Sequence, residues 1–430
     1  MSPLDRLFAL EQFGIKLGLD NIRTLLAAIG NPERTWRSIH IGGTNGKGSV
    51  AAMVERGLRE AGLHTGRYTS PHLDRIEERV ALDGTPVDRA TFETVTGHVL
   101  SVVDAARANG TLTVSPTFFE VSTAVAFEIF RRHAVDVAIV EVGLGGRYDA
   151  TNVLTPTIAA IVSIAFDHER HLGTTLSAIA FEKAGIAKEG VPLVIGRLPP
   201  EAAARVAEVA AEAGATILDA QATTARQYPP LTLALEGRHQ LDNAAVAVAI
   251  MERWSEMVSH VPTEAIVTGL TRCEWPARLE WLRMPGGGEL LIDAAHNPAG
   301  AMALASYLQD RGSPKLPIVF AAMADKDLGG MIKALEPVAS MFVATSVPHA
   351  RARGADEMAA AIRKLTGSVP VIAAPTPELA VARALEQSPR AAAAGSIYMV
   401  GPLRSRLIAA GAVPPGAVRL LGHRSLGEGG

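Results

Sequence analysis

Cysteine is nearly absent from this 430-residue sequence, in which Cys273 is the only one. A single cysteine excludes an intramolecular disulfide framework and a zinc cage made of thiolates. This usage is compatible with a reducing compartment, and we expect the protein to be cytoplasmic. The hydrophobic content of 48% is sufficient for sizeable buried cores.

A large charge of one sign and long apolar runs are missing as well. The net charge is −3, and no basic block is interleaved with aromatic residues, so we expect no nucleic-acid partner. The apolar run at 158–166 is much shorter than the roughly 20 residues of a membrane helix. The N-terminus lacks the basic flank and long apolar run of a signal peptide. We therefore expect small-molecule partners and no membrane association.

Short apolar runs alternate with helical patterns along the chain, which predicts an α/β fold with a mainly parallel sheet. The turn-rich segment Met284–Gly288 is the strongest boundary signal. We expect a larger N-terminal domain over 1–284 and a smaller Rossmann-like C-terminal domain over 285–430. The last strand of the second domain is predicted at 396–401, SIYMVG.

A glycine-rich loop at Gly42–Ser49, GGTNGKGS, stands between a predicted strand at 38–43 and a predicted helix at 47–61. In this context the backbone N–H groups and the helix N-terminus can hold phosphate oxygens. Lys47 can bridge the outer phosphates, and Ser49 can face a metal ion. Gly48 separates the lysine from the serine, unlike in the strict Walker pattern, and a plain glycine turn is the alternative. The strand–loop–helix context favours a nucleotide site.

Three charged or imidazole residues stand in apolar surroundings. Glu141 lies within an apolar strand pattern, His168 follows the strand predicted at 157–164, and Lys183 is flanked by alanine, glycine and isoleucine. A buried carboxylate needs a cation or hydrogen-bond donors. Taken singly, such residues also occur as exposed or structural groups. Together with a phosphate loop, Glu141 and His168 can form a site for a hard cation, although Mg²⁺ prefers oxygen ligands.

An ordered set of short motifs points to a family. The motifs are GTNGKGS, SPHL (70–73), TFFE (117–120), EVGLGGRYDATN (141–152), DHERHLG (167–173), EKAGI (182–186), HQLDNA (239–244), WPARLE (275–280) and DAAHNP (293–298). In this order the sequence resembles folylpolyglutamate synthases and dihydrofolate synthases of the Mur ligase superfamily. The resemblance implies an ATP-binding central domain followed by a glutamate ligase domain. It implies ATP and Mg²⁺ as cofactors, and dihydropteroate or a reduced folate with L-glutamate as substrates.

The resemblance also implies roles for individual residues. The nucleotide would be held by Thr44, Asn45, Gly46, Lys47, Gly48, Ser49, Asn243, Arg278 and Asp293. The metal would be held by Ser70, Glu141, His168 and Lys183, the last of these as a carbamate. The pterin site would be lined by Thr117, Phe118, Phe119, Glu120, Tyr148, Asp149 and Ala150. Tyr148 departs from the smaller residue of many bacterial members.

The implied reaction activates a carboxylate as an acyl phosphate, which the glutamate amine then attacks. Lys47 and Lys183 are the expected catalytic lysines, and His296 is one candidate for the group that accepts the amine proton. Lys326 could contact the incoming glutamate or be a surface charge. We expect a monomer. A peptidoglycan-type Mur ligase and a phosphate-loop switch protein are the alternatives; the short segment before the phosphate loop disfavours the first, and EKAGI disfavours the second.

Overall fold

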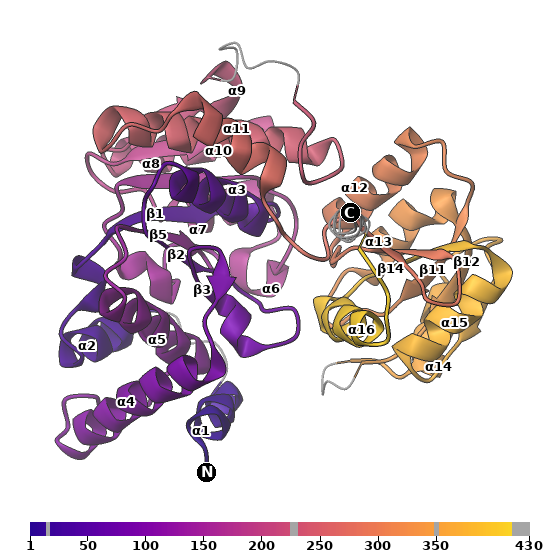
Figure 1. The fold of residues 1–430 in the computed structure, drawn as a ribbon, viewed down its shortest axis with the longest axis horizontal. Helices are drawn as coiled ribbons and strands as arrows, with labels where there is room; N and C mark the ends of the chain where they lie inside the picture. Colours follow the sequence, from indigo (N-terminus) through magenta and orange to yellow (C-terminus); the bar gives the residue numbers. More distant parts are fainter. Residues whose placement is uncertain (14–17, 224–230, 348–351, 415–430) are drawn as a thin grey trace, which may run out of the picture. The chain divides into compact units, whose positions relative to one another are not determined.

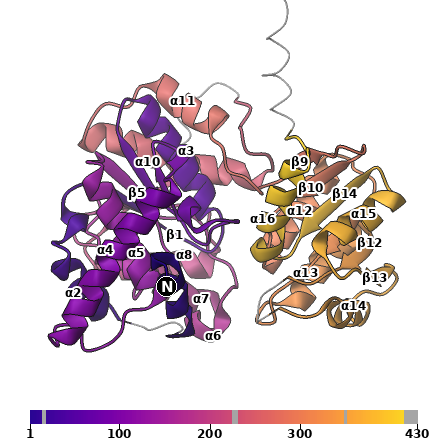
Figure 2. The same ribbon diagram turned by 60° about the horizontal axis from the view of Figure 1, so that its bottom comes forward.

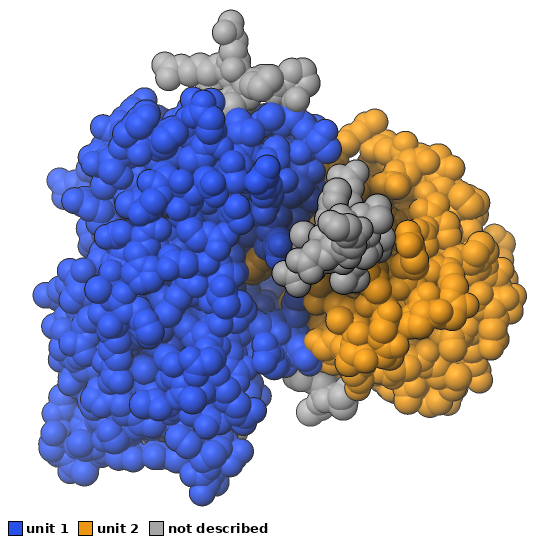
Figure 3. Space-filling model, viewed as in Figure 1, with its two compact units in different colours: residues 1–235, 240–274 blue, residues 236–239, 275–430 orange. Residues whose placement is uncertain are grey.

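The computed structural model describes residues 1–13, 18–223, 231–347 and 352–414, and its internal contacts divide these residues into two units. Unit 1 comprises 1–235 and 240–274, and unit 2 comprises 236–239 and 275–430, of which the described part is discussed below (Figure 3). Within the described ranges, no helix is both long and apolar enough to cross a membrane.

In its described residues, unit 1 contains an eight-stranded sheet in the order β4-β3-β2-β5-β1-β6-β7-β8. Neighbouring strands run parallel from β2 to β8, and β3 and β4 add an antiparallel edge. The strands are β1 (Arg37–Gly42), β2 (Thr65–Tyr68), β3 (Val80–Leu82), β4 (Thr85–Pro86), β5 (Val137–Glu141), β6 (Ile158–Ile161), β7 (Pro192–Ile195) and β8 (Thr216–Asp219). The central strands are buried along their whole length, which explains their continuous apolar sequences.

Helices cover both faces of this sheet (Figure 1). The helices are α1 (Pro3–Ala9), α2 (Asp20–Ala28), α3 (Lys47–Glu60), α4 (Arg89–Ala108), α5 (Phe118–Arg132), α6 (Glu169–Leu172), α7 (Leu176–Ala184), α8 (Pro200–Glu212), α9 (Ala220–Thr223), α10 (His239–Met257) and α11 (Thr263–Arg272). One core joins α1, α2, α4 and α5 to β2 and β5, and a second joins α7 and α8 to β6 and β7. α3 packs against α11. A short 3-10 helix, η4 (Ala150–Val153), precedes β6.

Unit 2 contains, among the described residues, a six-stranded sheet in the order β13-β12-β11-β14-β10-β9. Its strands are β9 (Glu280–Arg283), β10 (Glu289–Ile292), β11 (Leu316–Phe320), β12 (Ala339–Ala344), β13 (Val371–Ala373) and β14 (Arg390–Ala394). Its helices are α12 (Pro298–Asp310), α13 (Leu328–Leu335), α14 (Ala355–Arg363), α15 (Pro377–Gln387) and α16 (Ile397–Ala409) (Figure 2). α12, α13 and α14 share one apolar core with the sheet. The predicted α/β class with mainly parallel sheets is confirmed.

The segment Met284–Gly288 is the turn of a hairpin rather than a link between units. β9 and β10 pair antiparallel on either side of it, and Met284 N donates to Gly288 O at 3.0 Å. The predicted boundary at 284/285 therefore falls inside unit 2, and the contacts divide the chain after Glu274. Turn residues alone do not distinguish a hairpin from a linker, because glycine and proline are common in both.

The last strand of unit 2 differs from the predicted one. The sequence SIYMVG forms the start of α16, and the strand is β14, with the sequence RAAAA. β14 lies between β10 and β11, and its four alanines are completely buried. Alanine has a low intrinsic preference for strands, but its small side chain suits a central strand packed on both faces. Burial in the sheet therefore overrides local propensity here.

Candidate active site

The phosphate loop lies between β1 and α3, as the sequence predicts. Thr44 N donates to Ser163 O at 2.7 Å, and Thr44 Oγ1 donates to Ala165 O at 3.1 Å. Asn45 N donates to Ser163 Oγ at 3.0 Å, and that hydroxyl donates to Asn45 O at 2.9 Å. The loop is thus fastened to the segment after β6, at the carboxyl ends of the parallel strands, where α/β folds bind ligands. Sequence reasoning missed Ser163; the available signal was a polar residue near the end of the apolar run that forms β6.

Two lysines meet at one backbone carbonyl of this loop. Lys47 Nζ donates to Gly43 O at 3.1 Å and to Thr44 O at 3.2 Å, and Lys183 Nζ donates to the same Gly43 O at 2.9 Å. Glu141 Oε1 lies 3.8 Å from Lys47 Nζ. Lys47 is the first residue of α3, so its ammonium lies beside a helix N-terminus, a position suited to an anion such as a polyphosphate. The carboxylates of Asp167 and Asp149 act on Lys183 in addition.

Lys183 is the most perturbed of these groups. Its side chain is on α7 and the residue is only 5% exposed. Burial, and then the like charge of Lys47, lower the pKa of Lys183 to about 7, from an ordinary value of 10.5. A substantial fraction of this amine is therefore neutral, and so nucleophilic, near neutral pH.

The predicted metal ligands are only partly brought together. Ser70 N donates to Glu141 Oε2 at 3.2 Å, which places Ser70 and the buried Glu141 beside Lys47. His168 is exposed, has a left-handed backbone with φ 53°, and lies with its Nε2 3.8 Å from Asp167 Oδ2. Within the described ranges, no three His, Cys, Asp or Glu side chains gather closely enough to hold a metal. A metal here would thus need other oxygen donors, such as phosphates or a carbamate.

Ser49 and Asn243 are joined through a third residue. Gln240 Nε2 donates to Ser49 Oγ at 3.4 Å, and Asn243 Nδ2 donates to Gln240 Oε1 at 2.8 Å. All of them are buried. The first turn of α10 therefore lies against the first turn of α3, next to Gly46, and Gln240 was missed by the sequence reasoning.

Gly46 is a position where any side chain should be costly. Its φ is +85°, and an added Cβ would lie 2.3 Å from Asn243 Oδ1. We expect Gly46→Ala to lower the free energy of unfolding by about 2 kcal/mol or more and to weaken ADP binding. Denaturant unfolding and calorimetric titration with ADP measure the two effects.

Gly62→Ala is the matched control, because Gly62 is at the other end of α3 with φ +90° and nothing within 4 Å of its added Cβ. It carries the backbone strain without the collision, so it should cost about 1 kcal/mol and leave ADP binding unchanged. Equal effects of the two variants on ADP binding would contradict the placement of Gly46 in the site.

The predicted pterin-site residues surround the start of α5. Thr117 caps this helix, and its backbone N–H donates to Glu120 Oε2 at 2.7 Å, so both residues already have a capping role. The Phe118 ring stacks on Phe8 with centroids 5.9 Å apart, and the Phe119 ring lies against Gly143. Phe8, Phe118 and Phe119 therefore form an aromatic cluster, and its Phe119 ring reaches the loop that follows β5.

Tyr148, Asp149 and Ala150 lie on that same loop. The Tyr148 ring is 40% exposed, and the Arg147 guanidinium is stacked over it at 4.4 Å. Asp149 and Ala150 are buried, and Asp149 accepts from Leu144 N at 2.8 Å. Tyr148 is therefore the member of this trio that presents an exposed ring.

The predicted residues of unit 2 gather at the carboxyl end of β10. Asp293 accepts from Leu279 N at 2.9 Å and from Ala295 N at 2.8 Å. Burial raises the pKa of Asp293, whereas the neighbouring Arg278 opposes the rise. His296 Nδ1 donates to Ala294 O at 2.9 Å, which leaves Nε2 as the basic nitrogen of the neutral ring. His296 is thus in a tautomer that can accept a proton. Lys326 lies in the turn before α13.

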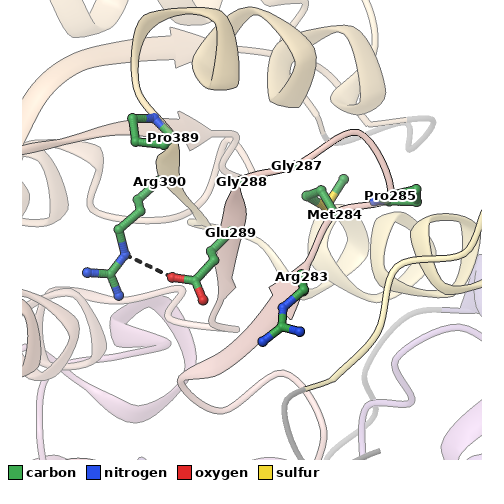
Figure 4. A pocket seen from close by; sticks show the side chains of 8 residues that line it. All are labelled: Arg283, Met284, Pro285, Gly287, Gly288, Glu289, Pro389 and Arg390. Atoms are coloured by element: carbon green, nitrogen blue, oxygen red, sulfur yellow. Dashed lines mark ion pairs between the residues drawn. The ribbon is translucent and has the colours of Figure 1, made fainter. Parts of the chain in front are cut away.

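A separate hollow of 510 Å³ lies at the β9–β10 turn of unit 2. Figure 4 shows its lining residues and the ion pair between Arg390 Nε and Glu289 Oε2, 3.1 Å apart. None of the predicted site residues lines this hollow. The chemistry of the predicted residues, rather than this hollow, therefore locates the candidate active site.

Comparison with known proteins decides the family. A dihydrofolate synthase/folylpolyglutamate synthase of Bacillus subtilis is 35% identical over 370 residues, which cover 81% of this chain and 85% of the relative. The chain belongs to this family of ligases. The model of the Mur ligase glutamate ligase domain matches residues 277–397, all within unit 2. Membership in this family sets aside both the peptidoglycan ligase and the switch protein.

Solved structures of the family agree in fold. Mycobacterium tuberculosis folylpolyglutamate synthase complexed with ADP superimposes with a TM-score of 0.87 and 32% identity, over 96% of this chain and 99% of that one. A bifunctional folylpolyglutamate synthase/dihydrofolate synthase with Mn, AMPPNP and L-glutamate bound superimposes with a TM-score of 0.83 and 29% identity, over 95% of this chain and 98% of that one. Members of this ligase family thus bind adenine nucleotides, a divalent metal and glutamate.

Proposed function

We propose that this protein joins L-glutamate both to dihydropteroate and to the γ-carboxyl group of reduced folates, with ATP and Mg²⁺. The family establishes ATP-dependent glutamate ligation. The observation that supports the residue roles is the pair of lysines on Gly43 O, with Glu141 beside one of them. In this proposal the Lys47 ammonium, together with the N-terminus of α3, would offer positive charge to the phosphates of ATP.

The first chemical step is the attack of the pteridine-linked carboxylate on the γ-phosphate. Negative charge builds up on the phosphate oxygens in this step, and the Lys47 ammonium, held at the loop, stabilises it. The N–H groups of Thr44 and Asn45 are engaged with Ser163, so the backbone N–H groups of Gly46 to Ser49 would orient the phosphates. The bond between the γ-phosphorus and the β,γ-bridging oxygen breaks, so ADP leaves and the carboxylate becomes an acyl phosphate, a far better electrophile than a carboxylate.

In the second step the glutamate amine attacks the acyl carbon and phosphate leaves. The attacking amine must lose a proton, and we assign His296 Nε2 as the acceptor, since Nδ1 is engaged with Ala294 O. Asn243, Arg278 and Asp293 are proposed to contact the nucleotide, and Lys326 is proposed to contact the glutamate carboxylate.

The donor set fits a divalent cation that is completed by phosphate oxygens. Glu141 provides a buried carboxylate, and the lowered pKa of Lys183 makes its carbamylation by CO₂ feasible, which would add an anionic oxygen ligand. Ser70 and His168 are the further proposed ligands. When bound, the metal would neutralise charge on the transferring phosphoryl group.

A substrate panel tests this function. We expect purified protein with ATP and Mg²⁺ to release ADP only when glutamate and either dihydropteroate or tetrahydrofolate are present together. Mass spectrometry should show one added glutamate on each acid. ATP hydrolysis without either acid, and no glutamylated product, would contradict the ligase assignment. Product from only one acid would restrict the enzyme to one of the two activities.

A further inference from the structure

His40 is a fully buried histidine in the middle of β1, two residues before the phosphate loop begins. Its Nε2 lies 2.8 Å from Thr151 Oγ1, and its Nδ1 is buried without a hydrogen-bond partner. Burial lowers the pKa of His40 to about 3, so the ring is neutral at physiological pH. A neutral histidine with one engaged nitrogen serves as a hydrogen-bonding group, not as an acid or base.

The direction of the hydrogen bonds follows from counting protons. The Thr151 hydroxyl also contacts Asp149 Oδ1, and a carboxylate can only accept. The single hydroxyl proton is therefore donated to Asp149, which leaves the Thr151 oxygen as an acceptor. His40 must then carry its proton on Nε2 and donate it to Thr151. The hydrogen bonds from His40 to Thr151 and from Thr151 to Asp149 therefore run in one direction, with each residue donating to the next.

Asp149 closes the loop of residues 143–149 on itself. Its carboxylate accepts from Leu144 N at 2.8 Å and from Thr151 N at 3.0 Å, and it receives a further backbone hydrogen bond from Gly143. Burial raises the pKa of Asp149, and these donors oppose that rise while they occupy most of the acceptor positions of the carboxylate. The carboxylate therefore acts mainly on its own loop.

This loop touches both the aromatic cluster and the helix that carries Lys183. An added Cβ on Gly143 would lie 2.4 Å from the Phe119 ring, and one on Gly146 would lie 2.7 Å from Lys183 O. Arg147 N donates to Glu182 O at 2.8 Å, and Arg147 Nη2 lies 2.6 Å from Glu182 Oε1. A displacement of the loop would therefore reach the aromatic cluster and α7 together.

We infer that His40 and Thr151 are positioning residues that hold the 143–149 loop in the conformation that binds the pteridine acid. Neither residue belongs to the phosphate loop, and both act through Asp149. β1 carries His40 and also leads into the phosphate loop. The hydrogen bonds from His40 through Thr151 to Asp149 would therefore hold the 143–149 loop in a fixed position relative to the phosphate loop. The inference rests on the proposed function, since it takes the loop to bind the pteridine acid.

Two substitutions of Thr151 distinguish a role in positioning the loop for the pteridine acid from a general contribution to the structure. Thr151→Ser keeps the hydroxyl, and Thr151→Val keeps the shape but removes it. We expect Thr151→Val to raise the KM for dihydropteroate by about tenfold or more, with the KM for ATP changed less than about twofold. Thr151→Ser should stay within about twofold of the parent enzyme in both constants.

Substitutions of His40, the first donor in this series of hydrogen bonds, should likewise change the KM for dihydropteroate more than the KM for ATP. His40→Gln can place an amide N–H near the original Nε2, whereas His40→Met cannot donate, so only the second should raise the KM for dihydropteroate. The double variant with Thr151→Val and His40→Met should have the same KM for dihydropteroate as Thr151→Val alone, because both residues act through the same series of hydrogen bonds. Binding of dihydropteroate in the presence of a non-hydrolysable ATP analogue, followed by fluorescence, gives a readout without turnover.

Failure of the inference differs from failure of the proposed function. If the parent enzyme glutamylates dihydropteroate but Thr151→Val and Thr151→Ser have equal KM values for it, the inference is wrong. Additive effects in the double variant, or equal rises in both KM values, would also overturn it. If Thr151→Val does not fold, the His40→Gln and His40→Met pair decides by the same criterion. A parent enzyme without any ligase activity would contradict the proposed function instead.

Discussion

Replacing Lys183 with alanine should lower kcat by about 100-fold or more, because the variant loses a buried group at the phosphate loop that we propose to supply an oxygen ligand as a carbamate. Formate or acetate should restore part of the activity by filling the vacated position with a carboxylate. The assay is steady-state ligation with increasing formate at constant ionic strength. The buried position and the contact with Gly43 O, 2.9 Å from Lys183 Nζ, are the reasons for the large effect.

The pH dependence of Lys183 gives a second measurement. CO₂ reacts with the neutral amine, and the pKa of Lys183 is lowered to about 7. Stimulation by bicarbonate should therefore rise from about pH 6 to about pH 8. In the unfolded chain the amine keeps its ordinary, higher pKa and binds more protons above pH 7. The contribution of Lys183 to the free energy of unfolding is thus least favourable below pH 7 and improves as the pH rises.

Lys188 provides the control for the formate experiment. It follows α7 closely, its Nζ donates to Asn152 Oδ1 at 2.7 Å, and it does not contact the phosphate loop carbonyl that Lys183 contacts. Lys188→Ala should show no rescue by formate. A fully active Lys183→Ala enzyme would refute the assigned role, and a severe defect that formate leaves unchanged would refute the carbamate.

Replacing Lys47 with alanine should reduce kcat/KM by about 100- to 1,000-fold without unfolding the protein. Lys47 provides the cationic group that we expect at the transferring phosphoryl group, and Glu141 Oε1 lies 3.8 Å from its Nζ. The loss is one of charge stabilisation in the transition state, so dihydropteroate binding should change little. Single-turnover phosphoryl transfer and circular dichroism melting give the two readouts.

A coupled effect on Lys183 makes the test of Lys47 sharper. The like charge of Lys47 contributes to the lowered pKa of Lys183. In Lys47→Ala, carbamate formation followed by carbon-13 NMR with labelled bicarbonate should shift to higher pH. Lys333→Ala, on α13 of unit 2, is a charge-matched control that should leave the rate and the carbamate titration unchanged. A near-normal rate for Lys47→Ala would show that the loop is not the phosphate site.

Several elements could be predicted because their signals are local. The phosphate loop has a strand before it, glycine where Gly46 needs φ +85°, and a helix with an apolar face after it. The Asp83-Gly84 pair in the turn between β3 and β4 is a hairpin signal that is visible in the sequence, and both residues adopt positive φ. The ordered motifs were sufficient for the family, which comparison confirmed. The structure gives the positions of the single site residues, and their roles stay predictions.

Other features could not be predicted because they depend on partners distant in the sequence. β14 is a strand of alanines only because it lies buried between β10 and β11. β2, with the sequence TGRY, has little apolar character, yet it is completely buried between β3 and β5. The turn at 284–288 has the composition of a domain boundary, and only the pairing of β9 with β10 identifies it as the turn of a hairpin.

The sequence by itself determined the fold class, the family and the strand–loop–helix arrangement around Gly42–Ser49, and it predicted roles for Lys47 and Lys183. These features are encoded in short segments, whose hydrophobic period, glycines and motif order need no knowledge of distant contacts. The tertiary structure alone decided that Lys47 and Lys183 share the Gly43 carbonyl and that His40 reaches Asp149 through Thr151. The physical reason is that parallel strands bring residues more than 100 positions apart to one edge of a sheet, and burial there sets their pKa values and hydrogen bonds.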